Sequence, residues 1–169
     1  MAASDTTPDP SDPSPAPGDE ATLRIAAPHE ELYRIVTDVG AMGRLSPECT
    51  GGQWLDGASG PVVGARFKGH NKRGWARWST TNTVVAAEPG QEFAFETKQS
   101  GTRWRYRFQP DGDATVVTES REACADLPLV AKVFATLALG GAGHHEDEMR
   151  QGMLDTLHRL KDVAEGATR

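Results

Sequence analysis

The feature that most constrains the fold is a series of turn signals between residues 52 and 122, which recur at roughly the 8 to 12 residue spacing of an antiparallel meander. Glycine, proline, asparagine and aspartate gather at these points because they adopt the backbone conformations that tight turns require. The turns fall at residues 57–64, 71–74, 88–91, 99–101 and 110–113. They predict six strands, near 52–56, 63–70, 75–87, 92–98, 102–109 and 114–123.

The strands near 92–98 and 102–109 show the clearest alternation of side chains between the two faces of a sheet. One face of this pair is aromatic, with Phe93, Phe95, Trp104, Tyr106 and Phe108. The opposite face is charged, with Glu92, Glu96, Arg103, Arg105 and Arg107. We expect the aromatic face to point into the protein.

Helical patterns flank this run of strands. A short first strand over Ala21–Ala26 leads to Pro28, which suits the first turn of a helix. The helix that follows has one apolar stripe, formed by Leu32, Ile35, Val36 and Val39. A second short helical piece is expected over Ala41–Leu45.

The C-terminal region predicts a long helix in two pieces. Apolar stripes run over residues 129–137 and 149–164, and the glycine-rich stretch 140–143 separates them. Each glycine inside a helix costs about 1 kcal/mol relative to alanine, so we expect a kink there rather than a domain boundary.

Charge and composition divide the chain into a tail and one domain. Residues 1–20 are rich in proline and carry acidic but no basic side chains, which predicts a disordered tail. The formal net charge is -6, so the domain predicted over residues 21–165 is nearly neutral. A near-neutral domain lacks the basic excess that nucleic-acid binding usually needs, and no segment is long and apolar enough for stable membrane insertion. With no secretion signal at the N-terminus, we expect a cytoplasmic protein.

The order of the predicted elements, and several local patterns, resemble the polyketide cyclase/dehydrase and lipid-transport branch of the START/Bet v 1-like (SRPBCC) superfamily. The matching stretches include Ala27–Tyr33, Ser46–Glu48, Gly60–Phe67, Trp104–Tyr106 and Thr115–Glu119. The resemblance implies an α+β helix-grip fold, in which a curved antiparallel sheet of about seven strands wraps around the long C-terminal helix. It also implies an apolar cavity between sheet and helix, but fold alone does not decide between carriers and enzymes.

The inward faces of the predicted strands supply the candidate ligand contacts. The strand over 75–87 allows two orientations, and we place Trp78 and Asn82 inward because the other orientation would bury Arg77. Together with the aromatic face, the predicted ligand-binding residues are Trp78, Asn82, Phe93, Phe95, Trp104, Tyr106 and Phe108. Ordinary core packing is the alternative role for these aromatic residues. No residue is assigned as catalytic.

Glu119 is the acidic residue whose orientation matters most. An Asp-Gly turn at 110–113 would pair it with Trp104 on the inner face, whereas one more loop residue would pair it with Arg105 outside. An inward Glu119 would be a candidate general base with a raised pKa. We favour the outward, salt-bridged arrangement, because unpaired carboxylates are rarely buried.

Metal and cofactor sites are not indicated. The cluster His144–Glu148 lacks an HExxH pattern and a third distant ligand, and its carboxylates suit a helix N-terminus. Cys49 and Cys124 are too far apart for a zinc motif, and we expect buried or half-buried thiols. We therefore predict no metal and no cofactor.

Three functions remain open at this point. The favoured one is binding of an apolar, ring-containing small molecule between the sheet and the C-terminal helix. The second is an aromatic polyketide cyclase, in which Tyr106, Trp78 and Asn82 would orient a polyketone for aldol condensation and dehydration. The third is a regulatory protein whose acidic tail contacts a partner. The oligomeric state is not predicted.

Overall fold

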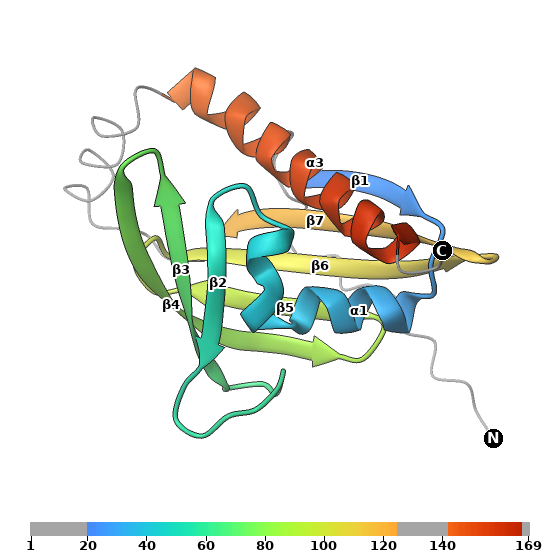
Figure 1. Ribbon diagram of the computed structural model, residues 1–169, viewed down its shortest axis with the longest axis horizontal. Coiled ribbons are helices and arrows are strands. Elements are labelled where there is room, and N and C mark those ends of the chain that lie inside the picture. The colour runs from blue at the N-terminus through green and yellow to red at the C-terminus, as the bar shows by residue number, and fades with distance from the viewer. Residues whose placement is uncertain (1–19, 125–141, 167–169) are drawn as a thin grey trace.

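The computed structural model describes residues 20–124 and 142–166, with side chains in the last helix from residue 150 onward. A curved seven-stranded sheet carries its helices on one face (Figure 1). In chain order the elements are β1 (Glu20–Ile25), α1 (His29–Thr37), the 3-10 helix η1 (Val39–Arg44), β2 (Cys49–Trp54), β3 (Arg66–Arg73), β4 (Ala76–Glu88), β5 (Glu92–Thr97), β6 (Thr102–Asp111), β7 (Ala114–Ala123) and α3 (Ala142–Gly166).

The strands follow the order β1-β7-β6-β5-β4-β3-β2, and every neighbouring pair is antiparallel. The predicted meander is therefore confirmed for β2 to β7, and β1 adds to its far side next to β7. A helix-grip-like α+β fold, with the C-terminal helix lying across the sheet, is also confirmed (Figure 1).

The predicted strand boundaries are least accurate around β2 and β3. β2 begins at Cys49 rather than near 52, and β3 runs from Arg66 to Arg73 rather than from 63 to 70. A bulge between Cys49 and Gly51, with Gly51 at φ 135°, extends β2 toward its N-terminus. Such a bulge depends on tertiary packing, which turn signals alone do not report.

Close packing of η1 against β2 explains the glycines of this region. A Cβ atom on Gly52 would lie 2.7 Å from the backbone oxygen of Lys68 and 3.1 Å from that of Val39. A Cβ atom on Gly43 would lie 2.7 Å from the backbone of Thr50. Only glycine fits these positions, and η1 is thereby held directly on the edge of the sheet.

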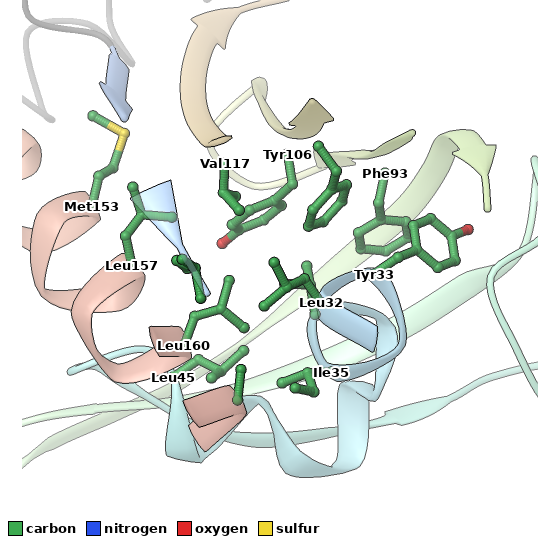
Figure 2. Packing of buried hydrophobic residues seen from close by; sticks show 14 of the residues in the cluster. Leu32, Tyr33, Ile35, Leu45, Phe93, Tyr106, Val117, Met153, Leu157 and Leu160 are labelled. Carbon is green, nitrogen blue, oxygen red and sulfur yellow. The ribbon is translucent and has the colours of Figure 1, made fainter. Parts of the chain in front are cut away.

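The core lies between the inner face of the sheet and helices α1 and α3 (Figure 2). The predicted stripe of α1 is confirmed, because Leu32, Ile35 and Val36 are buried together with Val39. From α3, Met153, Leu157, Leu160 and Ala164 are buried. The predicted stripe over 129–137 and the glycines at 140 and 141 lie outside the described residues.

The outer face of the central strands carries the predicted charges. Arg103 contacts Glu96 at 2.6 Å and Glu122 at 3.0 Å, and Arg105 reaches Glu122 at 3.3 Å and Glu92 at 3.5 Å. The alternation predicted for β5 and β6 is thus confirmed. This face is occupied by ion pairs, which leaves the opposite face as the place for an apolar site.

Candidate functional site

The candidate site is a buried polar pair on the inner face, formed by Tyr106 of β6 and Glu119 of β7. The two residues are directly opposite each other in the β6–β7 ladder. The Tyr106 hydroxyl donates a hydrogen bond to Oε1 of Glu119 at 2.8 Å. Their exposed fractions are 6% and 2%, so water does not share this contact.

The favoured outward orientation of Glu119 is therefore wrong. The β6–β7 turn pairs Asp111 with Ala114, so that Gly112 and Asp113 form a two-residue connection. Gly112 adopts φ 66°, which suits such a turn. This register places Glu119 opposite Tyr106, whereas the predicted inward alternative paired it with Trp104. The sequence offers several turn residues at 110–113, and the choice among them decides the partner.

Burial dominates the electrostatics of the pair. Desolvation raises the pKa of the Glu119 carboxyl from its ordinary value of 4.5 to about 8, although the hydrogen bond from Tyr106 opposes the shift. Burial, and then the charge of Glu119, raise the pKa of the Tyr106 phenol well above its ordinary range. At neutral pH Glu119 is therefore mainly a neutral carboxylic acid, which can donate as well as accept a hydrogen bond.

The second carboxyl oxygen of Glu119 forms no hydrogen bond with the described residues. Oε2 of Glu119 is buried and has no hydrogen-bond partner within the described part of the chain. A buried polar atom without a partner costs about 1 to 3 kcal/mol, so such atoms are uncommon and call for an explanation. The Tyr33 hydroxyl is likewise buried and unpartnered among the described residues.

Apolar residues from both layers surround the polar pair. Figure 2 shows the Tyr106 ring extending from the sheet toward α3, with its hydroxyl on the side of Leu157, and with Val117 beside it. Leu157 and Val117 are fully buried, with exposed fractions of 0%. The polar pair is thus set in apolar surroundings beneath α3, the layer in which the sequence predicts a ligand.

Three predicted site residues pack as core aromatics. The Tyr33 ring of α1 meets Phe93 and Phe108 edge-on, with centroids 6.4 and 6.0 Å apart. Phe95 meets Phe67 of β3 at 5.1 Å. Phe93 and Phe108 therefore lie beneath α1, and Phe95 lies toward the β3 side of the sheet.

Asn82 is buried, as its predicted inward orientation requires. Thr97 donates a hydrogen bond to its Oδ1 at 2.8 Å, and its Nδ2 donates to Thr80 at 3.3 Å. The amide is thus engaged within the sheet. Trp78, in contrast, is 41% exposed, because the first residues of β4 extend past the end of β5. By strand alternation Trp78 lies on the same, inner face as the buried Asn82, and its contact with a ligand stays a prediction.

Trp104 and Arg121 form the next pair along the β6–β7 ladder after Tyr106 and Glu119. Trp104 is half-buried against the core. Arg121 was not among the predicted residues. Because side chains alternate in a strand, an inward Glu119 implies that Arg121 also faces inward. Strand alternation would therefore have predicted Arg121 as an inner-face residue if the register of β7 had been known.

Residues of η1, the start of β2 and one residue of α3 line a hollow on the surface of the molecule. A surface depression there is lined by Gly40, Ala41, Gly43, Arg44, Ser46, Pro47, Cys49, Thr50 and Arg159. Cys49 is half-buried, and burial raises the pKa of its thiol. A second depression is formed by residues between Gly57 and Ala65, and neither depression is lined by Tyr106 or Glu119.

Both cysteines are free. Cys49 is half-buried as predicted, whereas Cys124 is exposed because it follows the last residue of β7. Among the described residues, no three His, Cys, Asp or Glu side chains are grouped so that they could hold a metal ion. The His144–Glu148 side chains lie outside that part. None of the described helices is long and apolar enough to cross a membrane.

Comparisons with solved structures support the helix-grip architecture. A polyketide-cyclase-like protein of Corynebacterium glutamicum is 30% identical, with a TM-score of 0.61 over 89% of this chain and 92% of its own. A Nitrosomonas europaea protein has a TM-score of 0.65 at 11% identity, over 90% of this chain and 98% of its own. The di-domain aromatase/cyclase of the steffimycin biosynthetic pathway matches at 12% identity and a TM-score of 0.62, over 86% of this chain and 44% of its own. The last two likenesses concern the fold alone.

The fold and the buried inner-face pair define a helix-grip protein of the SRPBCC kind. A family model described as polyketide cyclase / dehydrase and lipid transport matches residues 20–165. The chain belongs to this family, as its resemblance to the superfamily predicted. No curated protein matches it.

Proposed function

We propose that this protein binds an apolar, ring-containing small molecule that carries a carbonyl or hydroxyl oxygen, on the inner face of the sheet beneath α3. The observation that carries the proposal is the buried Tyr106–Glu119 pair, with one carboxyl oxygen unpartnered within the described residues. A ligand oxygen at that position would complete the hydrogen bonding of the pair. Trp104 and Phe95 supply apolar surface next to it.

The chemistry of Glu119 specifies which ligand oxygen fits. A neutral carboxyl donates a hydrogen bond to a carbonyl or hydroxyl oxygen, whereas a ligand carboxylate would bring an unpaired charge into an apolar site. The preferred ligand is therefore neutral at the site. Because the pKa of Glu119 lies at about 8, affinity for a neutral ketone should fall as the pH rises through that value.

Family membership supports the class of ligand. The family description joins polyketide cyclases with lipid transport, and both activities handle largely apolar molecules. On the basis of the sequence, we also propose that the protein works in the cytoplasm without a bound cofactor. In this proposal the predicted contacts Phe93 and Phe108 belong to the core that packs against Tyr33 of α1 and borders the ligand site.

A titration with an apolar fluorophore tests the proposal. We expect saturable binding of about one fluorophore per chain and quenching of tryptophan emission, because pockets for small molecules bury most of the ligand surface. Val62→Ser changes an exposed residue away from α3 and should leave binding intact. Uptake that never saturates, or that is equally strong in unfolded protein, would contradict a defined site.

Protection of Cys49 locates the site independently. In a Cys124→Ser variant, the half-buried Cys49 is the remaining thiol and lines the depression next to α3. We expect a saturating ligand to slow alkylation of Cys49 by a thiol reagent. The same ligand should leave Cys124 labelling unchanged in the Cys49→Ser variant, since that thiol is exposed at the end of β7.

The cyclase alternative is favoured by one observation, the raised pKa of Glu119. A carboxyl with a pKa of about 8 can exchange a proton near neutral pH. As a carboxylate it would take a proton from a methylene between two ketones. The resulting enolate carbon would form a bond to a second carbonyl carbon, whose oxygen takes up a proton, and loss of water would follow.

Incubation with a poly-β-ketone thioester tests this alternative. The cyclase predicts a cyclised, dehydrated product whose rate of formation increases with pH up to about 8, because the carboxylate form is the base. Glu119→Gln should abolish this rate while retaining fluorophore binding. Equal rates in both proteins would exclude Glu119 as the base and leave the binding function standing.

A further inference from the structure

The β3–β4 hairpin carries the most uneven charge in the described chain. Between residues 57 and 87 the sequence contains no aspartate or glutamate, although the whole protein has a net charge of -6. Basic side chains are concentrated there instead: Arg66, Lys68, Lys72, Arg73 and Arg77. This segment is therefore positive in a protein that is acidic overall.

Two tryptophans are exposed at the tip of the same hairpin. Trp75 lies in the turn and is 94% exposed, and Trp78 is 41% exposed. A Cβ atom on Gly74 would meet no atom of the described residues within 4 Å. Single exposed apolar residues are common, but two indoles on one protruding tip form a concentrated apolar surface.

Two basic residues lie next to these tryptophans in the hairpin. Lys72 and Arg77 are paired across the β3–β4 ladder, and both are exposed. Neither forms an ion pair within residues 20–124 and 142–166, in contrast to Arg66, which contacts Asp56 at 2.6 Å. Arg73 differs from them as well, because it lies 3.6 Å from Glu48.

We propose that this tip, formed by Lys72, Trp75, Arg77 and Trp78, docks the protein onto the surface of an anionic lipid bilayer. Indole rings favour the headgroup region because one edge is apolar and the N–H is polar. Lysine and arginine are attracted to anionic lipids. In Figure 1 the turn that joins β3 to β4 lies at one end of the sheet.

A bilayer fits these observations better than a nucleic acid does. Proteins that bind single strands usually present a basic groove with several stacking platforms along it. Here the two exposed indoles and the cations beside them lie at the end of one hairpin, and the remainder of the chain carries a large acidic excess. Docking also does not depend on the ligand proposed for the inner face.

Sedimentation with vesicles tests the docking. We expect the protein to sediment with phosphatidylcholine vesicles that contain phosphatidylglycerol, with a shift of tryptophan emission to shorter wavelength. Vesicles of phosphatidylcholine alone should retain much less protein, and added salt should release it because the charge attraction is screened. Equal binding to both vesicles, or binding to neither, would overturn the proposal.

Variants assign the effect to the tip. Lys72→Gln and Arg77→Gln should each weaken binding about fivefold, and Trp75→Ser should remove much of the emission shift. Arg34→Gln on α1 and Val63→Ser in the β2–β3 loop are matched controls, because they change an exposed cation and an exposed apolar residue elsewhere. All of these side chains are exposed, so unchanged circular dichroism and denaturation midpoints are expected.

Controls that weaken binding as much as the tip variants would overturn the proposal, since any surface charge would then suffice. A labelled single-stranded oligonucleotide supplies the other test. If it bound more tightly than the anionic vesicles and displaced them, the tip would be a nucleic-acid surface and the bilayer proposal would be wrong.

Discussion

At the scale of single residues, the chemistry of this protein centres on Glu119. Its carboxyl is 2% exposed, accepts one hydrogen bond from Tyr106 and has a second oxygen without a partner among the described residues. Burying such a group lowers the free energy of unfolding relative to an apolar residue of similar size. We propose that a hydrogen bond to a ligand oxygen offsets this cost.

The cost has a pH dependence with a defined sign. The folded-state pKa of Glu119, about 8, lies above its ordinary value of 4.5, so the folded protein binds this proton more tightly than the unfolded chain does. Stability from this group is therefore fully present below about pH 4.5 and is lost progressively as the pH rises to about 8.

Glu119→Gln isolates this effect, because glutamine stays neutral at every pH. We expect the variant to gain stability relative to the natural protein as the pH rises, by up to about 1.4 kcal/mol per pH unit within that window. Urea denaturation at several pH values measures the difference. Parallel stability curves for the two proteins would show that Glu119 is not buried and neutral.

Tyr106→Phe tests the hydrogen bond of the pair. Loss of the hydroxyl should cost about 0.5 to 1.5 kcal/mol of stability, since little volume changes. It should also raise the pKa of Glu119 further, because the Tyr106 bond lowers that pKa. The carbonyl stretch of the protonated acid, followed by infrared difference spectroscopy against pH, reports the shift. An unchanged midpoint would mean that the two side chains are not coupled.

At the scale of elements, the fold followed largely from local signals. Turn residues at regular spacing located β2 to β7, and the stripes of α1 and α3 identified the buried helix faces. The site was harder to predict, because it depends on one register. Shifting the β6–β7 connection by a single residue would move Glu119 to the outer face, and 110–113 contains several residues that favour turns.

Trp78 shows a second limit of pattern reasoning. Alternation gives the face of a strand, but it does not say where the covering layer ends. β4 begins at Ala76, well before the first pair that joins it to β5, so its first residues are exposed whichever face they occupy. The extent of a core is a tertiary property that the periodicity of one strand cannot report.

The contact between η1 and β2 yields a prediction at this scale. Gly52→Ala places a methyl group 2.7 Å from the Lys68 carbonyl oxygen, where no rotamer change relieves the clash, so we expect a loss of about 1 to 3 kcal/mol. Gly60→Ala is the matched control, with no atom within 4 Å of its Cβ position. Thermal denaturation compares them, and similar midpoints would mean that η1 does not pack closely on β2.

At the scale of the whole molecule, we expect the domain to fold without its acidic tail. A chain beginning at Ala21 keeps every buried residue of the described core. Its midpoint of thermal denaturation should lie within about 2 °C of that of the full chain. A substantially lower midpoint in calorimetry would show that the tail contributes contacts to the domain.

The two proposed binding surfaces, for the ligand and for the bilayer, lie on different parts of the molecule. The proposed ligand site lies on the inner face beneath α3, whereas the proposed bilayer-docking surface lies at the tip of the β3–β4 hairpin. Variants of Lys72, Trp75 and Arg77 should therefore leave fluorophore binding unchanged, and variants of Glu119 should leave vesicle binding unchanged.

The central claim is that Glu119 recognises a ligand oxygen, and a cycle of two proteins and two ligands measures this contact directly. The ligands are a tricyclic aromatic ketone and the hydrocarbon in which a methylene replaces the carbonyl, each titrated into the natural protein and Glu119→Leu below pH 8. We predict that the ketone loses about 0.5 to 1.5 kcal/mol of binding free energy more than the hydrocarbon does in the leucine variant, and that Glu119→Gln restores the preference. Equal losses for both ligands would contradict the claim, because Glu119 would then make no contact with the ligand oxygen.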